Sequence, residues 1–177
     1  MLSLSEAKKH LVVEDSHDDA LIGSLVAAAT DFIEGHTHQT IKERVKTLVI
    51  DGFSDEIELP AVPVQSVDSI KYNDTDEAEQ TLATSVYRVD SRNLKTKVCL
   101  AYDQDWPNTT AAPESVTITY TAGYEAGLEP ELLKQAALLL LGSLYDQREN
   151  HITGVSIGEV PISAEFLMQK YVVPVIG

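Results

Sequence analysis

Cysteine is scarce in this chain, and its scarcity excludes two kinds of site. The 177 residues contain one cysteine, Cys99. An intrachain disulfide therefore cannot form, and a zinc site made of four thiolates cannot exist. Cys99 lies within the apolar stretch KVCLAYD, where we expect a small buried side chain. A catalytic thiol would need a neighbouring base and partial exposure.

Positive charge is also scarce. The chain has 13 Lys and Arg residues against 28 Asp and Glu residues, which gives a net charge of −15 at pH 7. Proteins that bind nucleic acid by neutralising phosphates need clustered Lys and Arg side chains. We therefore expect the chain and DNA to repel each other. With 44% hydrophobic and 23% charged residues, the composition is otherwise that of a globular protein with a substantial core.

Long apolar segments are missing. No apolar run approaches the roughly 20 residues that a membrane-spanning helix needs. The N-terminal segment MLSLSEAKKHL is charged and has no signal-peptide core. We therefore expect no membrane association, and a protein that is made and kept in the cytoplasm.

The periodicity of apolar residues predicts helices, then strands, then helices. A first helix is expected over residues 4–10, where Ser3 and Glu6 form a capping-box pattern. A second is expected over residues 18–34, with Gly35 as its stop. Residues 45–122 contain short alternating segments with turns between them, which predicts an antiparallel meander. The clearest strand is SVTITYTAGY, with Val116, Ile118 and Tyr120 on one face. A long helix is expected over residues 130–149, followed by an amphipathic segment at 163–177, so the fold class is α+β.

Two groups of residues could bind a metal ion. The acidic group contains Glu14, Asp15, His17, Asp18 and Asp19, and the second group is His36 with His38. The acidic group lacks the spacing and glycine of a calcium loop, so a solvated helix-capping loop is the better interpretation. Gly123 and Gly127 favour a turn rather than a phosphate cradle, because no Lys-Ser or Lys-Thr follows. We expect no catalytic residue, no metal site and no cofactor.

The long helix carries four consecutive leucines, Leu138 to Leu141. Consecutive residues advance about 100° around a helix, so these leucines point to every side. One interpretation is a core helix covered by its own chain. The other is that one face packs on a neighbouring subunit, since exposed leucines promote association. The residues that we predict for such an oligomer interface are Leu133, Ala137, Leu140, Leu141 and Leu144.

The C-terminal segment offers a second candidate surface. Its apolar side chains are Phe166, Leu167, Tyr171, Val172, Val173, Val175 and Ile176. One interpretation is that this tail folds back on its own domain. The alternative is that Phe166, Leu167, Tyr171, Val173 and Ile176 dock on another protein or on a neighbouring subunit.

The succession of these segments resembles a known family. In order they are LSLSEAKKHL, DDALIGSLVAAATDFIEGHT, ELPAVPVQSVDSIKY, YRVD, VTITYTAGY and PELLKQAALLLLGSLYDQRE. Nearly the whole chain is similar to the head–tail connectors of long-tailed bacteriophages, also called adaptor or head-completion proteins. Members often have Thr-Gly-Arg after the second helix, where this chain has His36-Thr37-His38. A contact made by the family arginine is therefore not carried over.

The resemblance implies a fold, a role and partners. The fold would be mainly an α-helical bundle with an inserted antiparallel β-sheet or meander. It would form one connector domain over residues 1–177, with N-terminal helices at 1–35, a β-rich part at 45–122, the long helix at 129–149 and the C-terminal helix and tail at 163–177. The role would be structural: a roughly dodecameric ring beneath the portal that joins head to tail and extends the DNA channel.

The implied partners are the portal protein, a tail or stopper protein and further copies of the chain, with DNA passing through without specific binding. The chain would reside in the virion, and in the host cytoplasm during assembly. Acidic residues facing the channel would repel DNA and let it slide. Two rival hypotheses are a small metal-dependent hydrolase that uses the acidic and histidine groups, and a DNA-packaging accessory protein.

Overall fold

The chain folds into two compact units. The computed structural model describes residues 1–92, 95–146 and 162–174. One unit is helical and consists of Met1–Ile41 together with Glu125–Gly177, and the other is built of strands and consists of Lys42–Tyr124. The chain therefore leaves the helical unit once, completes the β unit as one continuous segment, and returns.

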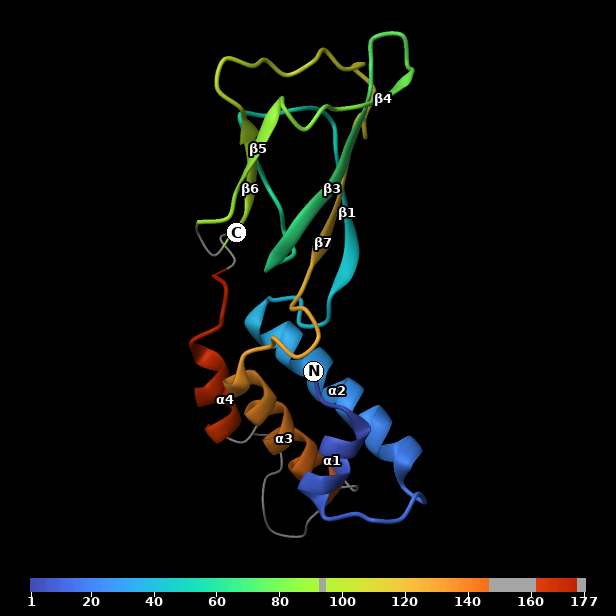
Figure 1. Ribbon diagram of the computed structural model, residues 1–177, viewed down its shortest axis with the longest axis vertical. Helices are drawn as coiled ribbons and strands as arrows, with labels where there is room; N and C mark the ends of the chain where they lie inside the picture. Colours follow the sequence, from blue (N-terminus) through green and yellow to red (C-terminus); the bar gives the residue numbers. More distant parts are fainter. Residues whose placement is uncertain (93–94, 147–161, 175–177) are drawn as a thin grey trace. The chain divides into compact units, whose positions relative to one another are not determined.

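The helical unit contains α1 (Leu4–Leu11), α2 (Asp19–Thr37), α3 (Glu131–Asp146) and α4 (Ile162–Gln169). In Figure 1, α3 lies between α4 on one side and α1 and α2 on the other, and it contacts all three. Ala7, Ile22 and Leu141 form a buried cluster that joins α1, α2 and α3. The leucine-rich helix is thus covered mainly by helices of its own chain.

The start of α1 confirms the predicted capping box. The Ser3 hydroxyl accepts a hydrogen bond from the Glu6 backbone N–H, and the Ser3 N–H donates to the Glu6 carboxylate over 2.8 Å. Two backbone N–H groups without helical partners are satisfied in this way. The Ser3 hydroxyl also donates to the Glu6 carboxylate over 2.6 Å, and this bond and the one from the Ser3 N–H hold the pKa of Glu6 below its ordinary value, the hydroxyl contributing most. The carboxylate therefore stays ionised where the positive end of the helix dipole favours it.

The predicted end of α2 at Gly35 is wrong. The helix continues to Thr37, and His38 takes the left-handed conformation, with φ of 55°. Asparagine, aspartate and histidine enter this region more readily than most side chains, so a histidine can end a helix where glycine is usual. The Thr37 hydroxyl donates to the Ile33 carbonyl over 2.7 Å, which uses a carbonyl within the last turn.

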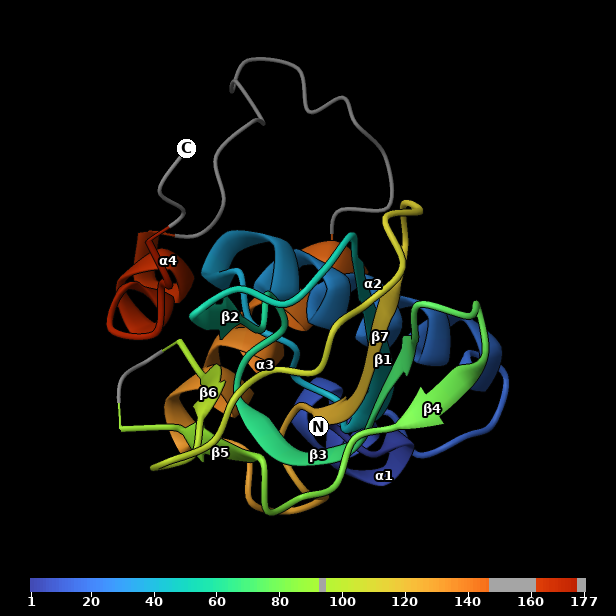
Figure 2. The same ribbon diagram turned by 90° about the horizontal axis from the view of Figure 1, so that it is seen from above.

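The β unit contains two antiparallel sheets rather than one meander (Figure 2). Its strands are β1 (Arg44–Ile50), β2 (Glu56–Glu58), β3 (Val64–Asn73), β4 (Glu79–Thr81), β5 (Tyr87–Asp90), β6 (Lys97–Leu100) and β7 (Val116–Ala122). The larger sheet has the order β1-β7-β3-β4, and the smaller has the order β2-β6-β5. The last strand, β7, inserts between β1 and β3, so the pairing is not sequential as a meander requires.

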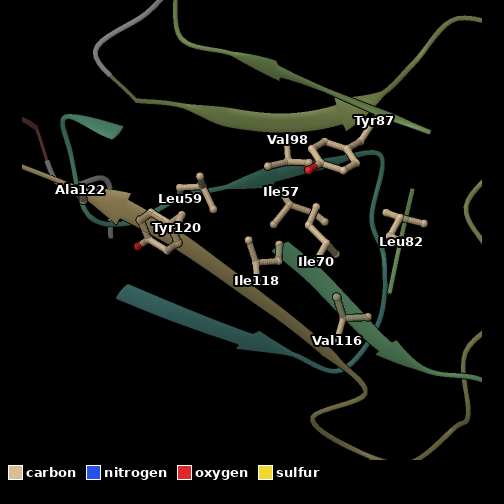
Figure 3. Close-up of a cluster of buried hydrophobic side chains, with 10 residues drawn as sticks. All are labelled: Ile57, Leu59, Ile70, Leu82, Tyr87, Val98, Val116, Ile118, Tyr120 and Ala122. Atoms are coloured by element: carbon tan, nitrogen blue, oxygen red, sulfur yellow. The ribbon is translucent and has the colours of Figure 1, made fainter. Parts of the chain in front are cut away.

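The alternation predicted for β7 is confirmed. Val116, Ile118 and Tyr120 are buried, and the threonines between them are half-buried. Figure 3 shows these side chains meeting Ile57 and Val98 from the smaller sheet in one core. Burying a large apolar side chain contributes about 1.5–3 kcal/mol. The two sheets are therefore held face to face by their own hydrophobic core.

The prediction of a mainly helical bundle is wrong. Helices hold about 32% and strands about 26% of the described residues, and the β unit has its own core. The helix–strand–helix order was correct. A sequence pattern indicates each short strand separately, but it does not show that seven of them enclose a core without help from helices. The extent of a single domain over residues 1–177 stays a prediction.

Candidate interaction surfaces

Four of the five residues predicted for an oligomer interface are covered by their own chain. Leu133, Ala137, Leu140 and Leu141 are buried, whereas Leu144 is 41% exposed. Leu133, Ala137, Leu140 and Leu144 share one stripe of α3, which faces the other helices until the cover ends near Leu144. A neighbouring subunit would therefore meet Leu144 and other side chains of α3. The oligomer interface itself stays a prediction.

The outward stripe of α3 begins with two leucines that the sequence analysis did not select. Leu132 is 39% exposed and Leu139 is 37% exposed. They are seven residues apart, which is two helical turns, so they lie on the same side of the helix. This spacing was visible in the sequence. The sequence did not identify these two leucines as the exposed ones, because Leu138, Leu140 and Leu141 make the other sides of the helix equally apolar.

An apolar groove runs between α3 and α4. It has a volume of about 440 Å³ and is lined by Leu132, Phe166, Leu167, Gln169 and Lys170. Phe166 is 74% exposed, although phenylalanine is among the most hydrophobic side chains. The docking candidates Phe166 and Leu167 therefore lie beside an outward leucine of α3.

The exposed surface continues from α4 toward α2. A second groove of about 330 Å³ is lined by His36, Glu165, Phe166 and Gln169. The His36 ring stacks on Phe32, with ring centroids 6.1 Å apart, and Phe32 is 39% exposed. We define the Phe166 patch as Phe32, Leu132, Phe166 and Leu167. The patch draws exposed and half-buried apolar side chains from three helices, and apolar surface of this kind marks interaction sites.

The segment after α4 folds back on the helical unit. Val173 is buried, and its N–H donates to the Thr37 carbonyl over 2.9 Å. The Gln39 side chain donates to the Tyr171 carbonyl over 2.6 Å. Tyr171 is half-buried, and Ile176 lies outside the described residues. Tyr171 and Val173 are therefore tied to the end of α2, while Phe166 is largely exposed and Leu167 is half-buried beside the groove.

The two groups of possible metal ligands lie at opposite ends of α2. The acidic group ends at Asp19, the first residue of α2, and the histidines flank Thr37, its last residue, so about 27 Å of helix separates them. No cluster of three or more His, Cys, Asp or Glu side chains arranged for a metal occurs among the described residues. The acidic group instead makes local bonds: Lys8 pairs with Asp19 over 2.6 Å, and the Tyr145 hydroxyl donates to Asp18 over 2.6 Å.

Glu129 is a buried carboxylate just before α3. Its carboxylate pairs with the Met1 ammonium over 2.6 Å and with Lys134 over 3.7 Å, and its side chain is 3% exposed. Burial by itself raises the pKa of Glu129. Hydrogen bonds from the Met1 ammonium, the Glu129 backbone and the Gly127 N–H lower the pKa by more than burial raises it, so the net pKa is below the ordinary value. These charges compensate one another within the fold.

The structure also bears on two expectations from the sequence, which concern Cys99 and membrane-spanning helices. Cys99 is half-buried on β6, with its side chain reduced. In the part of the chain that the structure describes, no helix combines the length and the apolar character needed to cross a bilayer.

Known proteins are similar to this chain over most of its length. Residues 1–102 match the family of phage gp6-like head–tail connector proteins. A search among curated proteins found no match. A chain in the virion of a native gene transfer agent particle is 25% identical, with a TM-score of 0.78, and the match covers 99% of this chain and 92% of that one.

Two structures of particle necks are similar as well. A chain in the neck of a native gene transfer agent particle, computed with C12 symmetry, is 25% identical with a TM-score of 0.73, covering 98% of this chain and 90% of that one. A chain in the neck of an empty particle, computed with C6 symmetry, is 24% identical with a TM-score of 0.79, covering 99% and 92%, and it supports the fold alone. Because the family match spans more than half of the chain, the chain belongs to the phage gp6-like head–tail connector family, and its function is the structural one of connecting head to tail.

Proposed function

We propose that copies of this chain form a ring of about twelve subunits at the junction of head and tail, resident in the virion after assembly in the host cytoplasm. The C12 symmetry of a similar neck structure supports this number. The portal protein would be the partner on the head side, and a tail or stopper protein would be the partner on the other side. The ring would be a scaffold without catalytic activity.

The Phe166 patch is the observation that carries the proposal. A small acidic chain gains nothing for its own folding by leaving Phe166 74% exposed. Exposed apolar surface of this kind promotes association unless a partner covers it. In an assembled neck, the patch would be covered by a neighbouring subunit or by the portal protein. Leu139 of α3, on the same side of the helix as Leu132, would extend the same contact.

The charge of the chain suits a channel through which DNA moves. Twelve copies at −15 each would surround the passing DNA with negative potential. Acidic side chains facing the channel would keep the phosphates from adhering, so DNA would pass without specific binding. A channel lined mainly by Lys and Arg side chains would contradict this part of the proposal.

Purified chain mixed with its portal protein and viewed by electron microscopy tests the proposal. We expect a ring of density on one face of the portal. The variant Phe166→Asp should lower ring occupancy at least about tenfold, since it places a charge in a desolvated contact. It should leave the melting temperature of the isolated chain nearly unchanged, because Phe166 is largely exposed.

The matched control is Tyr102→Asp. Tyr102 is an aromatic side chain that is 98% exposed but belongs to the β unit and not to the helical unit that carries the Phe166 patch. We expect this variant to assemble like the native chain. A portal that stays bare in the presence of native chain would refute the proposed ring. A ring that tolerates Phe166→Asp would refute the role of the patch.

A further inference from the structure

The larger sheet of the β unit has two open edges. In the order β1-β7-β3-β4, the outer strands are β1 and β4 (Figure 1), and within the described residues each pairs with one neighbour only. An open edge directs the N–H and C=O groups of alternate residues outward, where another strand can pair with them. β1 is seven residues long and contains no proline. Val45 and Val49 on this strand are 64% and 43% exposed.

The β1 edge is positively charged in a negatively charged chain. Lys42, Arg44 and Lys46 lie within five residues and have only Glu43 between them as an opposing charge. The whole chain has 13 basic residues, so this short stretch concentrates them. We call Lys42, Arg44 and Lys46 the basic edge. Lys42 and Arg44 are exposed, and Lys46 is half-buried.

The opposite edge of the same sheet is negatively charged. The hairpin that joins β3 to β4 carries Asp74, Asp76, Glu77 and Glu79, which we call the acidic edge. β4 follows this hairpin directly, and its three residues are exposed. Lys71 is the basic side chain that pairs with the acidic edge among the described residues, and it contacts Glu79 over 2.7 Å at the surface. A surface pair of this kind leaves the edge negative overall.

The acidic hairpin is held in a fixed shape. The Asp74 carboxylate accepts hydrogen bonds from the N–H groups of Asp76 and Ala78, each over 3.0 Å, and from the Gln80 side chain over 2.8 Å. Leu82 donates to Ile70 and Asp74 donates to Ala78 across the ladder. Since backbone groups alternate in direction along an antiparallel strand, Glu79 and Thr81 direct theirs to the open side. β4 is therefore held in place by β3 on one side and keeps its other edge open.

We propose that β1 of one copy pairs with β4 of the next copy, so that the basic edge of one subunit faces the acidic edge of its neighbour. β1 and β3 run in one direction and β7 and β4 in the other, because every pairing in the sheet is antiparallel. Placing β4 of a neighbour beside β1 continues that antiparallel pattern. The second copy is favoured over another partner because both complementary edges belong to one rigid sheet.

Joining two different edges makes a heterologous contact, which generates a ring when its rotation closes. The inference therefore rests on the proposed ring and names one contact within it. Complementary edges also fix the order of subunits, since two basic edges or two acidic edges repel each other. Main-chain hydrogen bonds would supply affinity, as in other cases of strand addition.

Charge reversal tests the inference. In chain assembled on its portal, R44E/K46E makes both edges negative, and D76K/E77K/E79K makes both edges positive while keeping Asp74, which holds the hairpin. Each variant should lower ring occupancy about tenfold or more, since like charges face each other. The variant with all five substitutions restores opposite charges and should recover most of the native occupancy. Such recovery also shows that the single-edge variants fail through contact and not through misfolding.

Disulfide trapping gives a second readout. In a Cys99→Ser background, T47C/T81C places one thiol on β1 and one on β4, and oxidation should give a ladder of linked subunits. T47C alone should give none, because β1 does not meet β1. Rings that withstand both charge reversals, or dimers of T47C alone, would overturn the edge pairing and leave the proposed ring intact. Failure of the native chain to form a ring would overturn both.

Discussion

Gly123, which follows β7, should be the least replaceable glycine in the chain. Its φ is +110°, and an added Cβ would lie 2.4 Å from the Lys42 carbonyl oxygen and 2.7 Å from the Glu43 backbone nitrogen. The residue is held there, because its N–H donates to the Pro63 carbonyl over 2.8 Å and its carbonyl accepts from the Gln65 side chain over 2.7 Å. The variant Gly123→Ala must therefore move backbone atoms and not a flexible side chain.

The expected cost has two parts. Holding a residue other than glycine in this region of φ costs about 1–3 kcal/mol. Ordinary contact with a Cβ begins at 3.4 Å, so the Lys42 carbonyl must retreat by about 1 Å, and a core forced to make such shifts loses about 1–3 kcal/mol more. The free energy of unfolding should therefore fall by about 4 kcal/mol, a large share of the typical stability of a domain.

Two other glycines provide matched controls. Gly127 has a φ of +88° but no atom within 4 Å of an added Cβ, so Gly127→Ala should cost about 1–2 kcal/mol. Gly23 lies within α2 with open space around it and an ordinary φ. Gly23→Ala should therefore stabilise the chain by about 0.5–1 kcal/mol.

Urea unfolding measures all three variants. Trp106 is the one tryptophan in the chain and stacks on Phe53 with ring centroids 4.7 Å apart, so its fluorescence reports on the β unit. Far-ultraviolet ellipticity follows the helices. Gly123→Ala should shift the fluorescence transition most. If Gly123→Ala costs no more than Gly127→Ala, the close contact with Lys42 does not limit this position and the reasoning is refuted.

Three further predictions concern the helical unit. Ser3→Ala should cost about 1 kcal/mol of stability in thermal unfolding, since it removes the capping hydroxyl; no loss would show that the cap is not needed. Leu141→Ala should cost about 2–5 kcal/mol because Leu141 is fully buried, whereas Leu139→Ala, at a 37% exposed position, should cost less than about 1 kcal/mol; equal losses would contradict the burial of α3. The pKa of Glu129 lies below its ordinary value of 4.5, so the stability it adds is present above that pH and is lost as the pH falls through the folded pKa. Glu129→Gln should therefore lose stability near neutral pH and show a flatter decline in acid, and an unchanged acid profile would refute the assignment.

Local structure was largely predictable from the sequence. The capping box of α1 depends on two side chains three residues apart, and the alternation in β7 depends on a repeat of two. Both signals are short-range, so neither needs knowledge of the rest of the fold. The predicted end of α2 at Gly35 was wrong because several neighbouring residues are able to end a helix. Here the helix continues to Thr37, and His38 takes the left-handed conformation that ends it.

Long-range organisation was not predictable in the same way. β7 pairs with β1 through the register Leu48–Ile118, across a sequence separation that no local pattern encodes. The division into two sheets depends on which strands share a core. A sequence alone also leaves open which side of an apolar helix its own chain covers. For this reason Leu133 and Ala137 were selected as interface residues, while Leu132 was not.

The resemblance to head–tail connectors was correct, although its motifs are individually weak. The order of segments carried it, from the capped first helix to the strand that ends at Ala122 and the helix that begins at Glu131. Each segment is common in proteins, but their succession is restrictive. The fold implied by the resemblance was wrong about the β unit, which has two sheets around a core of its own.

Joining of heads to tails in the absence of this chain is the most direct test of its function. Particles produced with the gene inactivated should accumulate as separate heads and tails, counted by electron microscopy. Adding purified native chain should restore joined particles, and the Phe166→Asp variant should not. Joined, tailed particles formed in the complete absence of the chain would contradict the account.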